Sequence, residues 1–452
     1  NSASLGTSSV IGMDIDVVGA TSGTSTATGL TVDVGSADTN YAALFNGGNV
    51  GIGTTAPDTG LHVAVSGNNG IEIESTDGAA VLTFDHASND ECRILFNEAG
   101  TTEGSIVYDS TSTDNMQFKV SSNGIRFKLD ANSRISLSNN DGQTGNTIFG
   151  HKAANGLTSG GTATTHNVVI GHEAFDLVTN QGAGSNVFIG AFTAGGTPTS
   201  ETDHNIGVGY GSLGALTSGD SNICIGSSAG VAITEEHSIV AIGRNAGAAI
   251  NNTNADGTVA IGHHALTALT SGAGNVAMGF QAMSTATTAL NSVAVGKHAM
   301  KDVKAAVAAD GCIAIGSSAL YGNSSNDTTI GGSIAIGSAA LYSLQTGVGN
   351  IGIGYTALTQ HTTGVRNIAI GYGAMDQTAG DAGAAPASTD NIFVGYNAGG
   401  GDWVNDAQSN YNIGIGNSAL DADLDGALYN VCVGFETGSA ITSGGHNTIM
   451  GN

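Results

Sequence analysis

The chain of 452 residues contains 71 glycines and 3 prolines, and charged residues make up only 11% of it. Hydrophobic residues still reach 40%, mainly alanine, isoleucine, valine and leucine, which argues against intrinsic disorder. The net charge of −26 at pH 7 argues against a nucleic-acid partner, because phosphate contacts need clustered lysine and arginine.

The composition also limits the kind of core that the chain can build. With few large side chains it can fill many thin cores but not one thick core, which is typical of solenoids and fibres. No apolar run approaches the length of a membrane span. The spacings of the four cysteines indicate neither a zinc site nor a disulfide framework. The chain begins at Asn1 and ends inside a repeated motif, so we expect a piece of a longer polypeptide.

Residues 1–60 contain two related pieces, "GMDIDVVGATSG" from Gly12 and "GLTVDVGSADTN" from Gly29. The stretch "YAALFNGGNVGIGTTAPDTGLHV", Tyr41 to Val63, follows them. We interpret residues 1–60 as β-rich shaft or linker repeats.

Short apolar runs separated by Gly, Asn and Asp turns follow each other over residues 61–140. Among them are "IEIES", "AVLTFDH", "RILFNEA", "SIVYDS" and "MQFKVS", and this pattern predicts a β-meander. Alternation within "MQFKV" and "IRFKL" places Lys119, Arg126 and Lys128 away from the apolar face.

Residues 141–452 form an internal repeat that is anchored on the glycine of an "IG" or "VG" step. Successive anchors are never closer than 17 residues and never further apart than 24, as expected for coils with one tolerant loop. The anchors are Gly150, Gly171, Gly190, Gly209, Gly226, Gly243, Gly262, Gly279, Gly296, Gly316, Gly337, Gly354, Gly371, Gly395, Gly416, Gly434 and Gly451.

The three residues before each anchor alternate between large apolar and small side chains, as in Ile313, Ala314 and Ile315. A period of two predicts a β-strand. Both faces are apolar, whereas a strand facing water would carry polar residues on one side. We therefore expect one face to fill the interior of the coil and the other to meet another chain.

Asparagine occupies most positions four residues before the anchor. In stacked coils these side chains predict an amide ladder, in which each rung bonds the rungs above and below. The ladder residues that we single out are Asn222, Asn275, Asn350, Asn367, Asn391, Asn412 and Asn430.

Strings such as "NIAIGYGAM", from Asn367, resemble the head repeats of trimeric autotransporter adhesins, which form parallel β-rolls. They resemble repeat arrays of bacteriophage tail fibres more closely, and "NVGIGTTAP", from Asn49, is similar to a linker common in those fibres. The resemblance of the repeat covers residues 147–452, although adhesin head repeats are typically shorter than these coils. It implies a homotrimer in which the segment before the repeat interleaves three chains as a triangular prism.

No catalytic constellation stands out, and we predict no enzyme and no cofactor. His151, His172 and His263 each follow an anchor, so stacked coils would bring imidazoles together around a metal or an anion. We prefer the interpretation that they are solvated turn residues. A structural divalent cation is left open, since acidic loops bind Ca²⁺ only with converging oxygens.

Trp403 is the only tryptophan and lies in a long insertion, where it either stacks on a sugar or anchors its loop. With Tyr396 and Tyr411 it forms our expected set of glycan contacts.

The sequence therefore predicts an all-β fibre: an elongated parallel β-solenoid with coils of about 17 residues, preceded by a β-meander or triangular prism. The resemblance implies a non-enzymatic, homotrimeric structural and receptor-binding segment of a virion tail, without a membrane span. Its expected partners are other tail proteins and a host surface polysaccharide or protein receptor, bound multivalently. The alternative is the head of a trimeric adhesin on a bacterial cell surface. A polysaccharide-degrading tailspike is a third reading, and it would need paired carboxylates about 5 to 10 Å apart.

Overall fold

The computed structural model describes most of the chain after residue 48. The described residues are 49–52, 54, 56–57, 59–64, 71, 73, 79–84, 91–98, 101–109, 115–120, 124–130, 135–136, 145–155, 164–178, 182–197, 202–303, 309–322, 329–378, 387–403 and 407–451. The chain divides into two compact units, Asn1–Asp85 and His86–Asn452. The expected divisions after residues 60 and 140 stay predictions. No helix among these residues is long and apolar enough to cross a bilayer.

The described part of the first unit holds one parallel strand pair. Strand β1 (Val50–Ile52) pairs with β2 (Leu61–Val63), and Asn49 Nδ2 donates to the Pro57 carbonyl at 3.0 Å across the intervening turn. The stretch "NVGIGTTAP" thus supplies a strand and the turn after it. Residues 1–48, where further β-rich repeats are expected, lie outside the described residues.

The described residues of "IEIES" and "AVLTFDH" carry no strand, contrary to the expected meander there. Their apolar side chains face solvent: Ile71 is 69% exposed, Val81 66% and Leu82 62%. Alternation gives a chain the side-chain pattern of a strand, but a strand also needs a neighbouring backbone to complete its hydrogen bonds.

Five antiparallel strands follow in the second unit and pair in chain order, as a meander does. They are β3 (Glu91–Glu98), β4 (Thr101–Asp109), β5 (Asn115–Val120), β6 (Gly124–Asp130) and β7 (Ile135–Ser136). Lys119 lies opposite Ser105, on the other side of the sheet from Phe118, as the alternation predicts. The side chains of Arg126 and Lys128 lie outside the described part.

The apolar face of this meander is open in the single chain. Ile94 is 40% exposed, Phe96 55%, Met116 44% and Phe118 40%. The opposite face is better covered, since Val107 is buried there. The meander alone therefore leaves its largest apolar side chains in contact with water.

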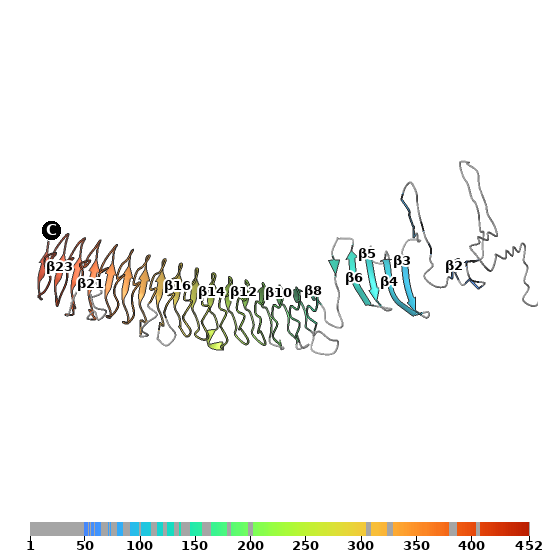
Figure 1. Cartoon of the computed structure of the whole chain (residues 1–452), viewed down its shortest axis with the longest axis horizontal. Helices are drawn as coiled ribbons and strands as arrows, with labels where there is room; N and C mark the ends of the chain where they lie inside the picture. Colours follow the sequence, from blue (N-terminus) through green and yellow to red (C-terminus); the bar gives the residue numbers. More distant parts are fainter. Residues whose placement is uncertain are drawn as a thin grey trace, which may run out of the picture. The chain divides into compact units, whose positions relative to one another are not determined.

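Seventeen parallel strands of three residues each occupy the described residues from 147 to 450, one strand per coil (Figure 1). They are β8 (Thr147–Phe149), β9 (Val168–Ile170), β10 (Val187–Ile189), β11 (Ile206–Val208), β12 (Ile223–Ile225), β13 (Val240–Ile242), β14 (Val259–Ile261), β15 (Val276–Met278), β16 (Val293–Val295), β17 (Ile313–Ile315), β18 (Ile334–Ile336), β19 (Ile351–Ile353), β20 (Ile368–Ile370), β21 (Ile392–Val394), β22 (Ile413–Ile415), β23 (Val431–Val433) and β24 (Thr448–Met450). This arrangement confirms the predicted parallel β-solenoid.

Each strand of the solenoid pairs with the strand of the coil before and the coil after, in register. Ala314 of β17, for example, lies opposite Ala294 of β16 and Ala335 of β18. Within the described residues β8 pairs with β9 alone and β24 with β23 alone, so the strands form an open row and not a ring. The anchors are therefore stacked along the solenoid, as the repeat predicted, and are not arranged as in a β-propeller.

The middle residue of each strand from β9 to β23 points into the coil and is small in most of these strands, and the two apolar residues beside it point outward. Ala314 is 0% exposed, whereas Ile315 is 39% exposed. A larger middle residue is accommodated by glycine in the next coil: Phe393 lies opposite Gly414, where a Cβ would come within 2.6 Å of the phenylalanine ring. The interior is thus thin and closely packed, as its small side chains require.

The anchor glycine is required by both conformation and space. Gly316 has a φ of 135°, which side chains other than hydrogen rarely tolerate. A Cβ on it would also lie 2.6 Å from the carbonyl of Gly337 in the next coil. The backbone beyond the strand therefore turns sharply and stacks directly on the coil that follows.

After the anchor, the chain forms a turn, and the buried side chains of this turn complete the core of the coil. In one coil Ala282 and Met283 are buried, and the amide of Met283 donates to the Ala299 carbonyl of the next coil at 2.9 Å. The amide of Gln281 donates in the opposite direction, to the His263 carbonyl of the preceding coil at 3.0 Å. Insertions leave this stacking intact: the 3-10 helix η1 (Thr253–Ala255) lies between β13 and β14, which still pair in register.

Candidate functional site

The asparagines four residues before the anchors form a buried ladder in two blocks of the solenoid. Asn391 shows the pattern: its Nδ2 donates to Asn367 Oδ1 at 3.1 Å and to the Ser409 carbonyl at 2.8 Å. Its Oδ1 accepts from the amide and the Nδ2 of Asn412, at 2.9 and 3.1 Å. Each amide group thus joins three coils, and its burial is compensated by hydrogen bonds.

The ladder has two blocks with an interruption between them. The first block ends at Asn222, whose Oδ1 accepts from the Ile239 amide at 2.9 Å. Asn275 lies in the interruption, between Thr258 and Ser292, and its amide bonds only backbone groups. The second block is unbroken and contains Asn350, Asn367, Asn391, Asn412, Asn430 and Asn447.

The outward strand positions form a second feature, which we call the outward stripe. It comprises the first and third residues of strands β9 to β23, and every one of them is Ile, Val or Met. They are half-buried or exposed: Met278 is 40% exposed, Ile370 37% and Ile415 41%. At about 4.8 Å per coil, the stripe runs for roughly 65 to 70 Å along the solenoid.

Exposed tyrosines flank the outward stripe in two separate columns. Tyr355, Tyr372 and Tyr396 follow their anchors, and their rings stack at centroid distances of 5.1 and 5.5 Å. On the other flank Tyr411 stacks on Tyr429 at 4.9 Å. The structure therefore places Tyr396 and Tyr411 at opposite ends of the strands, at 57% and 46% exposure, and not in one pocket.

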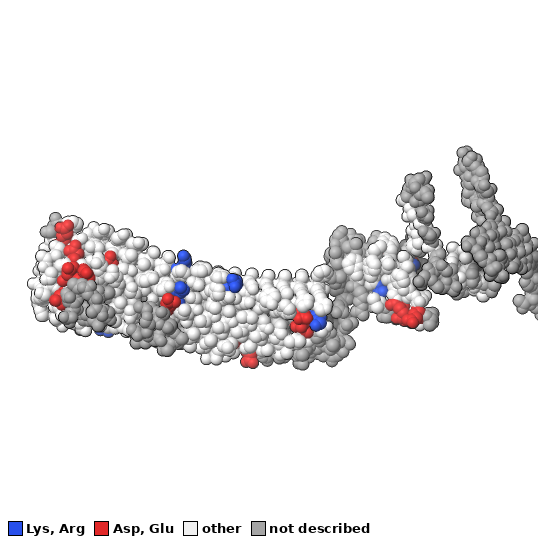
Figure 2. Space-filling view, in the orientation of Figure 1, with Lys and Arg blue, Asp and Glu red and all other residues white. Residues whose placement is uncertain are grey.

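A charged pair continues the second column. Arg366 and Asp390 form two hydrogen bonds, Nε to Oδ1 at 2.7 Å and Nη2 to Oδ2 at 2.9 Å. Hydrogen bonding to this guanidinium lowers the pKa of the Asp390 carboxyl, which stays ionised. On the face drawn in Figure 2, most of the described solenoid surface carries no charge, and acidic side chains gather toward its C-terminal end.

Trp403 is buried, contrary to its expected role in glycan contact. It is 4% exposed, its ring packs edge-on against Phe393 at 5.7 Å, and its Nε1 donates to the Gly399 carbonyl at 3.1 Å. Of the two alternatives for this residue, its position fits the loop anchor, because neither ring face is open to a sugar.

The histidines that follow anchors come together as the stacked repeat predicts. His151 and His172 stack at 5.1 Å, and Glu173 lies beside them. His263 and His264 are 4.2 Å apart, with His263 also stacked on Phe280.

Sequence reasoning missed His361, which is 1% exposed inside a turn. Its Nδ1 contacts Thr378 Oγ1 at 3.0 Å and its Nε2 contacts the ladder amide of Asn367 at 3.3 Å. Burial lowers its pKa from 6.5 to about 4, so the ring is neutral near pH 7. The signal that could have found it is its place seven residues after the anchor Gly354, where other coils carry a buried aliphatic residue such as Leu216, Ile250 or Leu269.

The repeat can thus offer long rows of identical groups, apolar on the sheet face and aromatic or charged on its flanks. Comparison with family models, with curated proteins and with solved structures found no match to this chain.

Proposed function

We propose that this chain is a non-enzymatic, structural and receptor-binding segment of a bacteriophage tail fibre, assembled as a homotrimer. The observation that carries the proposal is the outward stripe, in which Ile, Val or Met occupies the first and third place of every strand from β9 to β23. A monomer that faces water rarely exposes so long an apolar surface, and such surfaces mark interaction sites.

A second copy of the same chain is the partner that fits this stripe best. The stripe repeats once per coil, so a partner has to match that spacing over the whole length of the solenoid. A parallel copy has the same spacing by construction, and closed symmetry limits how many copies can share the contact. The number three comes from the resemblance to tail fibres and adhesin heads.

The meander supports the same conclusion independently. Its open face presents Phe96, Met116 and Phe118 to solvent, and Ile71 and Val81 of the preceding segment are also exposed. In an assembly of interleaved chains these side chains would be covered. Two different elements of one chain therefore each leave an apolar face open.

For receptor binding, the supporting features are the tyrosine columns. Within a column the ring faces are covered by neighbouring rings, so Tyr372 offers its edge and hydroxyl and not its face. A row of hydroxyls repeated once per coil suits a linear surface polysaccharide, held by many weak contacts. Tyr396 and Tyr411 keep the role proposed from the sequence, whereas Trp403 does not.

The head of a trimeric bacterial cell-surface adhesin is the second candidate, because it would use the same solenoid and the same apolar stripe. A membrane anchor encoded further along the same gene would favour it. The fibre linker "NVGIGTTAP", from Asn49, favours the tail fibre.

Sedimentation of the full chain tests the assembly. We expect a particle near three times the chain mass of 44.5 kDa. Changing Ile315 and Ile336 together to Asp places charge in the stripe and is expected to reduce assembly. Ser317→Asp is the matched control, since Ser317 is exposed on the same coil but lies outside the stripe. A folded wild-type monomer would contradict the proposal.

Binding of the assembled protein to a panel of bacterial surface polysaccharides and whole cells tests the receptor role. Tyr396→Ala and Tyr411→Ala are expected to weaken whatever binding the wild type shows. If the protein binds none of the polysaccharides and none of the cell types, the receptor role is contradicted but the fibre assembly is not.

A further inference from the structure

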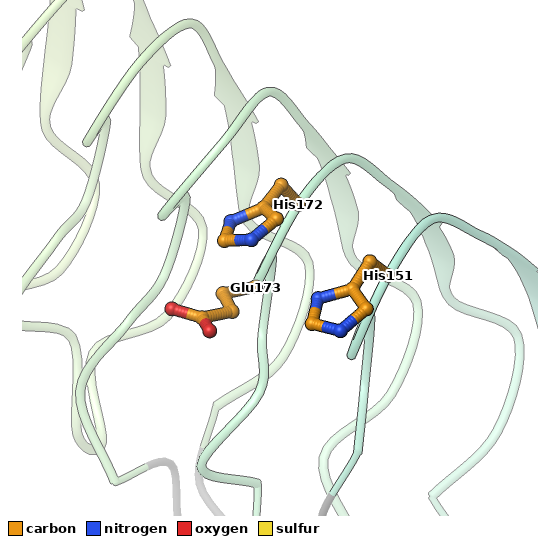
Figure 3. A group of neighbouring side chains, drawn as sticks. All are labelled: His151, His172 and Glu173. Carbon is orange, nitrogen blue, oxygen red and sulfur yellow. The ribbon is translucent and has the colours of Figure 1, made fainter.

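His151 and His172 occupy the same position in two successive coils, directly after Gly150 and Gly171. Their imidazoles stack with an interplanar angle of 17°, and the carboxylate of Glu173 lies beside them (Figure 3). One ligand atom from each of the three side chains lies within 4.8 Å of the other two.

Two imidazole nitrogens and one carboxylate oxygen are a donor set that Zn²⁺ accepts in proteins. We propose that His151, His172 and Glu173 bind one divalent transition-metal ion of the zinc class, with water completing the coordination. The ion would bridge the first two coils of the solenoid. This inference does not depend on the fibre proposal.

The backbone already holds the two coils in the register that the site needs. The Glu173 amide donates to the His151 carbonyl at 2.9 Å. Tetrahedral bonds of about 2.1 Å place ligand atoms about 3.4 Å apart, so the three side chains have to move closer together and the imidazoles have to tilt. Both histidines are exposed and Glu173 is only half-buried, so side-chain rotation can supply that movement without shifting the backbone.

Lys152 is the group that competes with the ion. Its Nζ lies 3.1 Å from Glu173 Oε1, and its side chain is 51% exposed. The hydrogen bond from Lys152, followed by the charges of Lys152, His172 and His151, lowers the pKa of the Glu173 carboxyl. The carboxylate is therefore ionised and already paired with the Lys152 ammonium, and an ion would take the place of that exposed group.

The chain also contains a matched comparison. His263 and His264 are closer together than His151 and His172, at 4.2 Å between ring centroids. Their surroundings differ: burial lowers the pKa of His264, and the charges of His263 and Arg244 lower it further. A pair of imidazoles without an adjacent carboxylate should bind the ion much more weakly than the three-ligand site does.

Titration of the full chain with Zn²⁺ by calorimetry, and with Co²⁺ by visible absorption, tests the site. We expect one ion per chain, and affinity at least tenfold lower in His151→Asn, His172→Asn and Glu173→Gln, since even outer-sphere changes cost that much. Lys152→Met should raise the affinity. His263→Asn should leave it unchanged. Bound Zn²⁺ should also slow hydrogen exchange of the Glu173 amide.

Equal affinity in the wild type and in His172→Asn would overturn the proposal, as would no binding of either ion. Loss of binding in His263→Asn but not in His151→Asn would move the site to the other pair and would also overturn it. Circular dichroism of each variant separates loss of ligands from loss of fold.

Discussion

Replacing Asn391 with Asp tests whether the buried ladder depends on amide donors and not on shape alone. The two side chains have nearly the same shape, but the Nδ2 group becomes an oxygen. In the native protein that nitrogen lies 3.1 Å from Asn367 Oδ1, 3.1 Å from the Thr389 carbonyl and 2.8 Å from the Ser409 carbonyl. The substitution therefore places an oxygen that cannot donate a hydrogen bond opposite three oxygens that accept one.

The expected cost follows from the two hydrogens that are lost. The Ser409 carbonyl loses this donor, whereas Asn367 Oδ1 still accepts from the Asn391 backbone amide at 3.2 Å. A buried acceptor left without a donor costs about 1 to 3 kcal/mol, so Asn391→Asp should lower the free energy of unfolding by about 2 kcal/mol or more. A protonated carboxyl can restore one donor, so the pKa of the introduced group is raised above its unfolded value. The stability that the variant loses relative to the wild type should then be smallest at low pH and grow as pH rises through the folded pKa.

Hydrogen exchange of the amides in β21 and β22 measures this effect locally, because a repeat array need not unfold in one step. Near pH 7 we expect exchange roughly thirtyfold faster or more. Asn417→Asp is the control: this exposed side chain only accepts, from the Tyr396 amide at 3.1 Å, so its substitution should change little. The reasoning is refuted if the two variants behave alike, or if Asn391→Asp loses no stability relative to the wild type as pH rises.

Three further predictions concern single positions of the solenoid. His361 is neutral and buried with a pKa of about 4 against 6.5 when unfolded, so the protein should lose about 3 kcal/mol of stability as pH falls from 6.5 to 4, and His361→Gln should flatten that dependence in unfolding experiments. Gly316→Ala combines a disallowed φ with a clash against the next coil, so it should lower the free energy of unfolding by more than about 3 kcal/mol. Hydrogen exchange measures this loss, because the amides of that coil should no longer be protected. Ala314→Leu overfills the thin interior and should cost about 1 to 3 kcal/mol in thermal unfolding, whereas Ser271→Leu in a turn should change stability by less than about 0.5 kcal/mol. Equal effects of these last two would show that the strand faces are assigned wrongly.

The coil itself could be predicted from the sequence, because its determinants are local. Alternation over three residues defines the strand, and a glycine that no other residue can replace fixes where the chain turns. The asparagine four residues before that glycine then points into the coil in each coil that has one, so the position of Asn391 relative to Asn367 was predictable without coordinates.

The inward face could not be predicted in the same way, and the motif of a single coil does not reveal the gap in the ladder. Both faces of "IAI" are apolar, so alternation alone leaves two choices, and only packing shows that Ala314 fits inside while Ile315 does not. Asn275 matches the motif as well as Asn391 does, yet its neighbours in space are Thr258 and Ser292. Whether an amide has partners depends on the coils above and below it.

The sequence by itself determined the strands, the anchors and the parallel stacking, because each of these repeats within a single coil. Tertiary structure alone decided the contacts that an insertion makes, such as the packing of buried Trp403 against Phe393, and the approach of Glu173 to the two stacked histidines. The physical reason is that insertions change the sequence separation between coils while the hydrogen-bonded register stays the same. Contacts between side chains follow that register, and sequence distance does not report it.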